Sequence, residues 1–193
     1  MNDGIVSIAP AKEKYIIAAL HEMKENGVSN LTIRCVAGRC GVSPGAIYKH
    51  FSNKNDLILS VYKYVNKKWE EEQEKALANA LGTYRDKIVV ISLAYIHFLC
   101  SNPEIQSIVM NNDRSMPPEQ LAEKARLTNL TLELVRGYAK ETEMPEEMFI
   151  RKEFTLRSFV YGAAMMINSG TIPLNEETDS LIRKIVDREF DLP

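Results

Sequence analysis

A basic stretch without carboxylates is the first chemically distinctive feature of this sequence. Residues 26–55 contain no Asp or Glu, but they contain Arg34, Arg39, Lys49 and Lys54. The chain as a whole has a net charge of -2, yet residues 1–68 hold 10 Lys and Arg against 5 Asp and Glu. A surface that approaches nucleic-acid phosphates needs such a composition, because each carboxylate would repel the backbone. The stretch therefore indicates a phosphate-facing surface near the N-terminus.

Helix start and stop signals inside this stretch outline two short helices joined by a tight turn. Thr32 is placed to cap a helix over residues 33–40, and Gly41 is placed to end it. Ser43 is the next expected cap, followed by Pro44 at the first position of a helix over residues 44–51. Two short helices joined by a three-residue turn that contains glycine predict a helix-turn-helix.

In a helix-turn-helix, the first residues of the second helix meet base edges in the major groove. Gly45 would allow close backbone approach, Ala46 would contact a thymine methyl, and Lys49 would reach guanine acceptors or a phosphate. Tyr48 and His50 would flank these residues. The alternative is a merely solvated face of a small helical domain, but the missing carboxylates and the surrounding motif favour DNA contact.

Two further residues stand at the starts of neighbouring helices, Thr32 and Lys54. Free N–H groups and the helix dipole attract anions at such positions, so both residues are expected to anchor phosphates. Phe51 is instead expected to be a core residue of the small helical domain.

The segment TIRCVAGRCGVSPGAIYKHFSNKNDLILSVY closely resembles the DNA-binding domain of the tetracycline-repressor (TetR) family of transcriptional regulators. The resemblance covers about residues 11–65, and the glycine and serine of the turn stand in the family's register. It implies operator contacts at Thr32, Ser43, Pro44, Gly45, Ala46, Tyr48, Lys49, His50 and Lys54. Cys35 departs from the family, which commonly has an acidic residue there. Gly38 is a second departure, costing about 0.5–1 kcal/mol inside a helix.

The remaining pattern predicts an all-α protein of about nine helices, because no segment shows sustained two-residue alternation. Thr83 with Asp86 predicts a capping box for an apolar helix that ends before Pro103. The expected helices span residues 11–26, 33–40, 44–51, 54–80, 84–102, 103–110, 117–140, 145–170 and 176–190. We expect a DNA-binding domain over residues 1–53 and a larger helical domain over residues 54–193.

The resemblance implies that the larger domain binds a small effector and forms a homodimer through its last two long helices. Small and apolar residues suited to that interface are Phe159, Gly162, Ala163, Ile167, Leu181 and Ile185. Candidates for the effector pocket are Tyr95, His97, Phe98, Met110, Tyr138, Tyr161 and Met165. Aromatic and Met side chains at helical spacing are also typical of plain core, and His97 can equally be a hydrogen-bonded core histidine.

Catalysis has no positive signal in this sequence. The Glu-x-x-His pairs of helical di-iron proteins, Gly-rich phosphate loops, GxSxG and HExxH are all missing. Cys35 and Cys40 are not spaced as a metal site, so both are expected to be small core residues. No cofactor or metal is predicted. The longest apolar run, residues 88–100, is too short to span a membrane, and the N-terminal residues do not resemble a secretory signal, so we expect a cytoplasmic protein.

Together with these patterns, the resemblance implies a dimeric repressor that binds a palindromic operator in double-stranded DNA and is released by an unidentified small molecule. The alternative is a DNA-binding regulator without an effector, whose second domain serves dimerisation or protein contacts. An enzyme is not expected.

Overall fold

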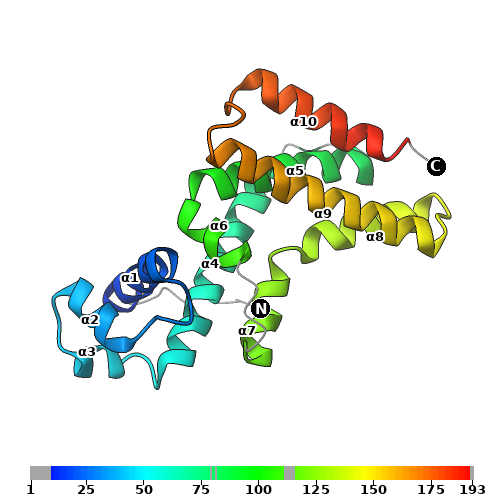
Figure 1. Cartoon of the computed structure of the whole chain (residues 1–193). Coiled ribbons are helices and arrows are strands. Elements are labelled where there is room, and N and C mark those ends of the chain that lie inside the picture. Colours follow the sequence, from blue (N-terminus) through cyan, green and yellow to red (C-terminus); the bar gives the residue numbers. More distant parts are fainter. Residues whose placement is uncertain (1–9, 79, 81, 111–115, 192–193) are drawn as a thin grey trace. The chain divides into compact units, whose positions relative to one another are not determined.

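The computed structural model describes residues 10–78, 80, 82–110 and 116–191, and within these ranges it contains ten α-helices and no strand (Figure 1). The all-α prediction is confirmed. The chain forms two compact units, residues 1–65 with 104–124 and residues 66–103 with 125–193. The N-terminal residues used to judge a secretory signal lie outside the described ranges. In the described part of the chain, no helix is both long and apolar enough to cross a membrane.

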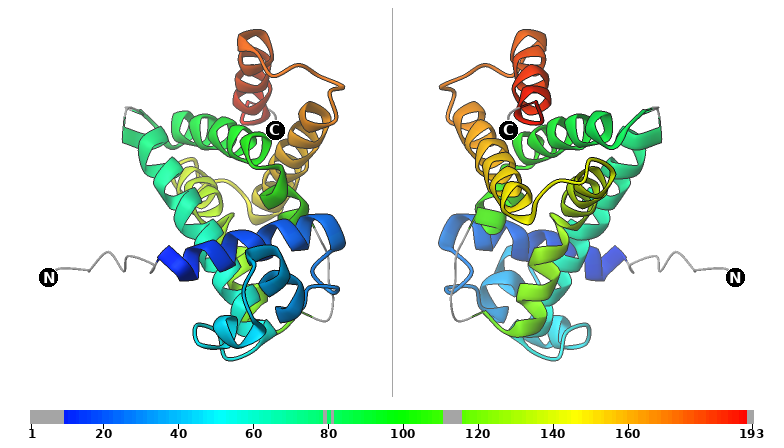
Figure 2. Two further views of the ribbon diagram at one scale, coloured as in Figure 1. Left: turned by 90° about the vertical axis from the view of Figure 1, so that its left-hand side faces the viewer. Right: turned by 90° about the vertical axis from the view of Figure 1, so that its right-hand side faces the viewer.

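The first unit is built on α1 (Pro10–Asn26), α2 (Ile33–Cys40) and α3 (Pro44–Tyr48). Helix α1 packs on α2, and α2 packs on α3 (Figure 2). The core side chains of these helices and the turn that follows them include Ile16, Leu20, Val36, Ile47 and Phe51. Phe51 is only 1% exposed, so its expected core position is confirmed. The core fixes the orientation of the two short helices.

Helix α4 (Lys54–Ala78) contributes side chains to both units. Asn53 caps its start, because the Asn53 side chain accepts the Asp56 backbone N–H at 3.0 Å and the Asp56 carboxylate accepts the Ser52 N–H at 2.8 Å. Leu57 and Val61 are fully buried in the first unit, whereas Trp69 is buried in the second. The first unit also contains most of α6 (Pro103–Met110) and of α7 (Pro118–Arg126).

Helix α5 (Tyr84–Ser101) is the central element of the second unit, and it contacts α8 (Asn129–Glu141), α9 (Glu146–Asn168) and α10 (Glu176–Glu189). The predicted capping box of Thr83 and Asp86 is present at its start. In the same first turn, Arg85 holds the end of α10 by donating to Asp187 at 2.5 Å and to Asp191 at 2.6 Å. The buried Lys152 of α9 also donates to the α10 carbonyl of Glu189 at 2.5 Å.

The prediction of a single helix over residues 117–140 is wrong, because the helix is interrupted between α7 and α8. Neither Gly nor Pro lies at the break. Instead, the Trp69 indole Nε1 donates to the carbonyl oxygen of Leu127 at 2.9 Å in the buried interior. The side chain of Leu127 is buried as well, whereas Leu121, expected to face inward, is 57% exposed. A tertiary hydrogen bond therefore ends the helix, which no local signal could indicate.

This hydrogen bond predicts a specific cost for a conservative change. Trp69→Phe removes the N–H, leaves the Leu127 carbonyl buried without its donor, and leaves space beside Tyr95 and Phe98. We expect the free energy of unfolding to fall by about 2–3 kcal/mol, measured by urea unfolding followed by circular dichroism. Leu121→Ala is the control, with a cost below about 0.5 kcal/mol because the side chain is exposed. Equal costs for the two variants would contradict the assignment.

Candidate functional site

The turn between α2 and α3 has the backbone geometry that the sequence predicted. Thr32 caps α2, since its hydroxyl accepts the Cys35 N–H at 3.1 Å. Gly41 ends α2 in the left-handed region at φ 69°, where a side chain would be strained. The next N–H, of Val42, donates to the Ala37 carbonyl at 3.0 Å and closes the turn. Ser43 then occupies the cap position of α3, with its hydroxyl making no capping hydrogen bond.

The nine residues predicted to contact DNA lie on the solvent side of this motif. Thr32, Ser43, Pro44, Gly45, Tyr48 and Lys49 are exposed, and Ala46, His50 and Lys54 are half-buried. Tyr48 is 55% exposed, which is unusual for an aromatic residue of a small domain and gives no support to a core role. Four of the nine residues line one shallow groove together with Arg34: Thr32, Pro44, Tyr48 and Lys54. The fold thus gathers residues from α2, α3 and α4 on one surface.

The basic residues of the acid-free stretch differ in their availability. Arg39 points to α1, where it donates to Glu22 at 2.6 Å and also pairs with Glu25. This hydrogen bond lowers the pKa of Glu22 below its ordinary value. Arg34 and Lys49, by contrast, make no ion pair or hydrogen bond with any residue that the structure describes. These two cations are therefore free to meet phosphates or bases.

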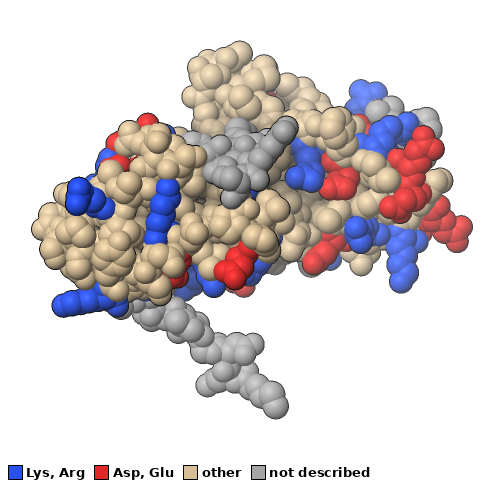
Figure 3. Space-filling view, turned by 60° about the horizontal axis from the view of Figure 1, so that its bottom comes forward, with Lys and Arg blue, Asp and Glu red and all other residues tan. Residues whose placement is uncertain are grey.

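Two predicted contact residues are positioned by neighbouring groups. The Lys54 ammonium donates to the carbonyl oxygen of Ser29 at 2.7 Å, which holds the start of α4 against the loop before α2. The His50 ring packs edge-on against Tyr15 of α1, with ring centroids 5.5 Å apart. Figure 3 shows separated Lys and Arg side chains on a mostly uncharged surface at the left of the view, where the first unit lies.

Cys35 does not have the buried position expected of it. It is exposed at the start of α2, where its sulfur accepts a hydrogen bond from the Thr32 hydroxyl at 2.9 Å. Cys40 is half-buried, and burial raises the pKa of its thiol. The core expectation is therefore wrong for Cys35, because the α2 stripe that faces inward consists of Ile33, Val36 and Ala37. In the described ranges, no group of three or more His, Cys, Asp or Glu is arranged to hold a metal ion.

The second unit contains a narrow cavity between α5, α8 and α9, with a volume of about 30 Å³. Its aliphatic wall alternates with a few hydroxyl groups, and one ion pair lies at its edge. The lining residues are Ser92, Tyr95, Thr128, Thr131, Leu132, Val135, Glu153, Leu156, Arg157, Val160 and Tyr161. Burial raises the pKa of Tyr95 well above its ordinary value, and the neighbouring Tyr161 raises it further. The Tyr95 phenol is therefore neutral.

Two of the seven effector-pocket candidates, Tyr95 and Tyr161, line this cavity. His97 instead lies on another face of α5, within 2.9 Å of the Asp179 carboxylate of α10. Three others are also elsewhere: Phe98 packs on Trp69, the Tyr138 hydroxyl donates to the Phe190 carbonyl, and Met165 is 56% exposed. Met110 ends α6, but its side chain lies outside what the structure describes.

Sequence reasoning missed most of the cavity wall, because the predicted pocket residues were mainly aromatic and Met residues, whereas much of the wall is aliphatic. The α8 contribution, Thr131 and Val135, has an ordinary helical pattern, and Ser92 is a small residue within an apolar run. The available signal was Ser92 itself, a polar residue within the apolar run of α5, where a buried hydroxyl needs a partner.

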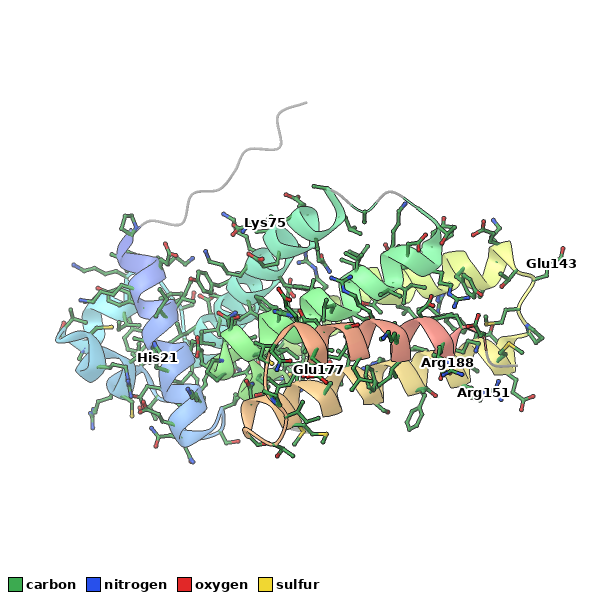
Figure 4. The ribbon with its side chains drawn as sticks, turned by 90° about the horizontal axis from the view of Figure 1, so that it is seen from above. His21, Lys75, Glu143, Arg151, Glu177 and Arg188 are labelled. Carbon is green, nitrogen blue, oxygen red and sulfur yellow. The ribbon has the colours of Figure 1, made fainter. Side chains whose placement is uncertain are left out.

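Helices α9 and α10 leave apolar side chains in solvent. Figure 4 shows Arg151 near the start of α9 and Arg188 near the end of α10 at the same end of the pair, with Glu177 at the opposite end, so the two helices are antiparallel. Of the predicted interface residues, Leu181 and Ile185 are exposed, Phe159, Gly162 and Ala163 are half-buried, and Ile167 is buried within the unit. The large apolar side chains that α9 and α10 expose include four that were not predicted for the interface. The exposed residues are Ile150, Phe154, Met165, Met166, Leu181 and Ile185.

Comparison with known protein families matches both units. The family model of bacterial regulatory proteins, tetR family, matches residues 16–61, and the model of the tetracyclin repressor-like C-terminal domain matches residues 88–188. A crystal structure of a TetR family transcription regulator from Marinobacter aquaeolei superposes with a TM-score of 0.76 at 18% identity, covering 93% of this chain and 94% of that one. This likeness shows the same fold.

Two curated relatives are similar in sequence. The HTH-type transcriptional regulator UidR of Escherichia coli is 26% identical over 151 residues, covering 78% of this chain and 63% of the relative. An uncharacterized HTH-type transcriptional regulator of Mycobacterium bovis is 43% identical over 49 residues, covering 25% of this chain and 23% of the relative. The chain thus spans less than two thirds of the length of either relative.

The environment of Gly45 predicts opposite effects on stability and DNA binding. A Cβ added at Gly45 would meet nothing closer than the Ser43 hydroxyl at 3.7 Å, so the fold itself does not require glycine there. We expect Gly45→Ala to leave stability unchanged or raise it by about 0.4–1 kcal/mol. Its affinity for a duplex selected from a random pool should fall about tenfold, because the methyl group blocks close approach to the bases.

Gly38→Ala is the matched control. Gly38 lies on the exposed side of α2 with open space around it, so alanine should stabilise the helix by about 0.5–1 kcal/mol. Thermal unfolding and fluorescence anisotropy with labelled duplex measure both properties. Retention of full DNA affinity by Gly45→Ala would show that α3 does not meet the bases through its first turn.

Proposed function

Because the chain belongs to the tetR family of bacterial regulatory proteins, we propose that it is a homodimeric repressor that leaves its palindromic operator when a small molecule binds its second unit. The proposal includes no catalytic step. The observation that supports it most is the surface formed by α2, α3 and the start of α4, where predicted contact residues lie exposed around a groove.

The chemistry of this surface suits a DNA major groove. Among the residues that the structure describes, Arg34 and Lys49 have no ion-pair partner. Ser43 offers a hydroxyl that makes no capping hydrogen bond, and Tyr48 offers a flat, exposed ring with a donor. Arg and Lys contacts supply affinity through counterion release, and the first residues of α3 supply base contacts. Two such surfaces, related by a two-fold axis, would read half-sites about one helical turn apart.

The exposed apolar face of α9 and α10 supports the homodimer. Phe154 is 72% exposed and Leu181 is 54% exposed, although soluble monomers rarely leave large apolar side chains clustered in water. A second copy of the same two helices offers a complementary apolar face, as a two-fold interface requires. Half-buried Gly162 and Ala163 would allow the facing backbones to approach closely.

The ligand response would act through α4. This helix runs without interruption from the DNA-binding unit into the second unit, where Trp69 packs 4.8 Å from Tyr95 between ring centroids. Tyr95 is also a wall of the cavity. A molecule that widens the cavity would disfavour the arrangement that holds Trp69, and by linkage the operator would disfavour that molecule equally.

The DNA-binding role predicts a salt-dependent effect at Lys49. We expect selection from random duplexes to yield a palindrome, and Lys49→Ala to weaken its binding and reduce the slope of log affinity against log salt by about one per protomer. Lys140→Ala, an exposed lysine of α8 in the second unit, is the control and should change neither quantity. Equal effects of both variants would mean that the cations act only through total charge.

If α9 and α10 form the dimer interface, one charged side chain introduced there should separate the protomers. Sedimentation of the wild type should give about twice the 21.9 kDa of one chain, and Leu181→Glu should give one chain, because a carboxylate would be buried at the interface. The variant should keep its helical circular dichroism, since Leu181 is exposed in the single chain. Operator affinity should fall with dimer loss. A dimeric Leu181→Glu would place the interface elsewhere.

A further inference from the structure

We propose that the cavity between α5, α8 and α9 takes a neutral, compact and largely apolar molecule with one hydrogen-bonding oxygen, which lies against Ser92 and Tyr95. The inference rests on the ligand response proposed above and adds the chemical class of the ligand. Three properties of the cavity carry it: two hydroxyl groups without partners, a balanced charge, and an aliphatic wall.

The two hydroxyl groups are the strongest observation. Ser92 is 1% exposed and Tyr95 is 4% exposed, and neither hydroxyl has a hydrogen bond of acceptable geometry with any described residue, although the Tyr161 hydroxyl lies close enough to Tyr95 to raise its pKa. Both residues line the cavity, one turn apart on α5. Buried polar groups are almost always paired, because leaving one unpaired costs free energy. A ligand oxygen placed between them would satisfy both hydroxyls.

The charges around the cavity select against an ionic ligand. Among the described residues that line it, the charged ones are Glu153 and Arg157, and Arg157 Nη1 already donates to Glu153 Oε1 at 3.2 Å. An anionic ligand would have to compete with Glu153 for Arg157, and a cationic ligand would have to compete with Arg157. Burying a charge without its own partner is unfavourable. A neutral ligand avoids both costs.

The wall and the volume define the rest of the molecule. Leu132, Val135, Leu156 and Val160 contribute aliphatic surface to the cavity wall. The free volume of about 30 Å³ matches the share of one water in the liquid. A single ring must therefore widen the cavity as it binds. Tyr95 lines the cavity and packs on Trp69, the only tryptophan of the chain, so a ligand that displaces Tyr95 would change the surroundings of the indole.

Three compounds that share one ring test the proposal on the full-length protein: cyclohexanol, cyclohexanecarboxylate and methylcyclohexane. Titrations follow Trp69 fluorescence and the midpoint of thermal unfolding. We expect cyclohexanol to shift the Trp69 emission saturably, with an affinity at least tenfold above that of cyclohexanecarboxylate. A carboxylate that binds as tightly as the alcohol would overturn the proposal. So would a lack of binding by all three, which would mean that a trapped water satisfies the hydroxyls.

The double variant Ser92→Ala/Tyr95→Phe locates the oxygen. It should bind cyclohexanol about tenfold more weakly while binding methylcyclohexane as tightly as the wild type or more tightly. Its thermal midpoint without ligand should not fall, because no hydrogen bond is lost, and this keeps folding separate from binding. Tyr138→Phe removes a tyrosine hydroxyl outside the cavity and should leave both affinities unchanged. An unchanged preference for cyclohexanol in the double variant would overturn the proposal.

Operator binding separates this inference from the proposed function. If cyclohexanol binds as expected but leaves operator affinity unchanged, the ligand class stands and the ligand response fails. If the operator is bound and the ring compounds show the wrong preference, the DNA-binding role stands and the ligand class is wrong.

Discussion

A buried indole N–H must find an acceptor, and the way this protein meets that requirement organises its second unit. Trp69 extends from α4 into the core and donates to the carbonyl oxygen of Leu127, and this hydrogen bond ends α7 and begins α8. Thr128, which directly follows Leu127, and Val135 of α8 both line the cavity between α5, α8 and α9. The hydrogen bond from Trp69 therefore holds the chain next to the cavity, and it comes from α4, whose first residue Lys54 belongs to the proposed DNA-binding surface.

The first unit keeps two cations available although carboxylates of α1 lie beside α2. Glu22 and Glu25 of α1 would reduce the positive charge of the DNA-facing surface if they were unpaired. Arg39 binds both of them, and the resulting hydrogen bond keeps the pKa of Glu22 low. Arg34 and Lys49 then remain without partners among the described residues. Arg39 thus stabilises the fold of the first unit, whereas Arg34 and Lys49 are available for the proposed contact with DNA.

Local rules predicted much of this protein, and non-local contacts explain the rest. The caps at Thr32 and Thr83 and the glycine that ends α2 depend on hydrogen bonds within four residues, so their spacing in the sequence was sufficient. The break at Leu127 depends on a partner 58 positions away, and no helix propensity could reveal it. The exposed Cys35 and the cavity wall were missed for the same reason, since burial and cavity shape are properties of several helices at once. The DNA contacts, effector and interface remain predictions from the sequence.

In the proposed complex, the α3 helices of the two protomers meet base edges in two successive major grooves. Methylation interference on the selected operator tests it most directly, because dimethyl sulfate modifies guanine N7 in the major groove and adenine N3 in the minor groove. We expect interference by guanine N7 methylation in two patches whose centres lie about one helical turn apart. Interference confined to adenine N3, or a single patch of guanines, would contradict it.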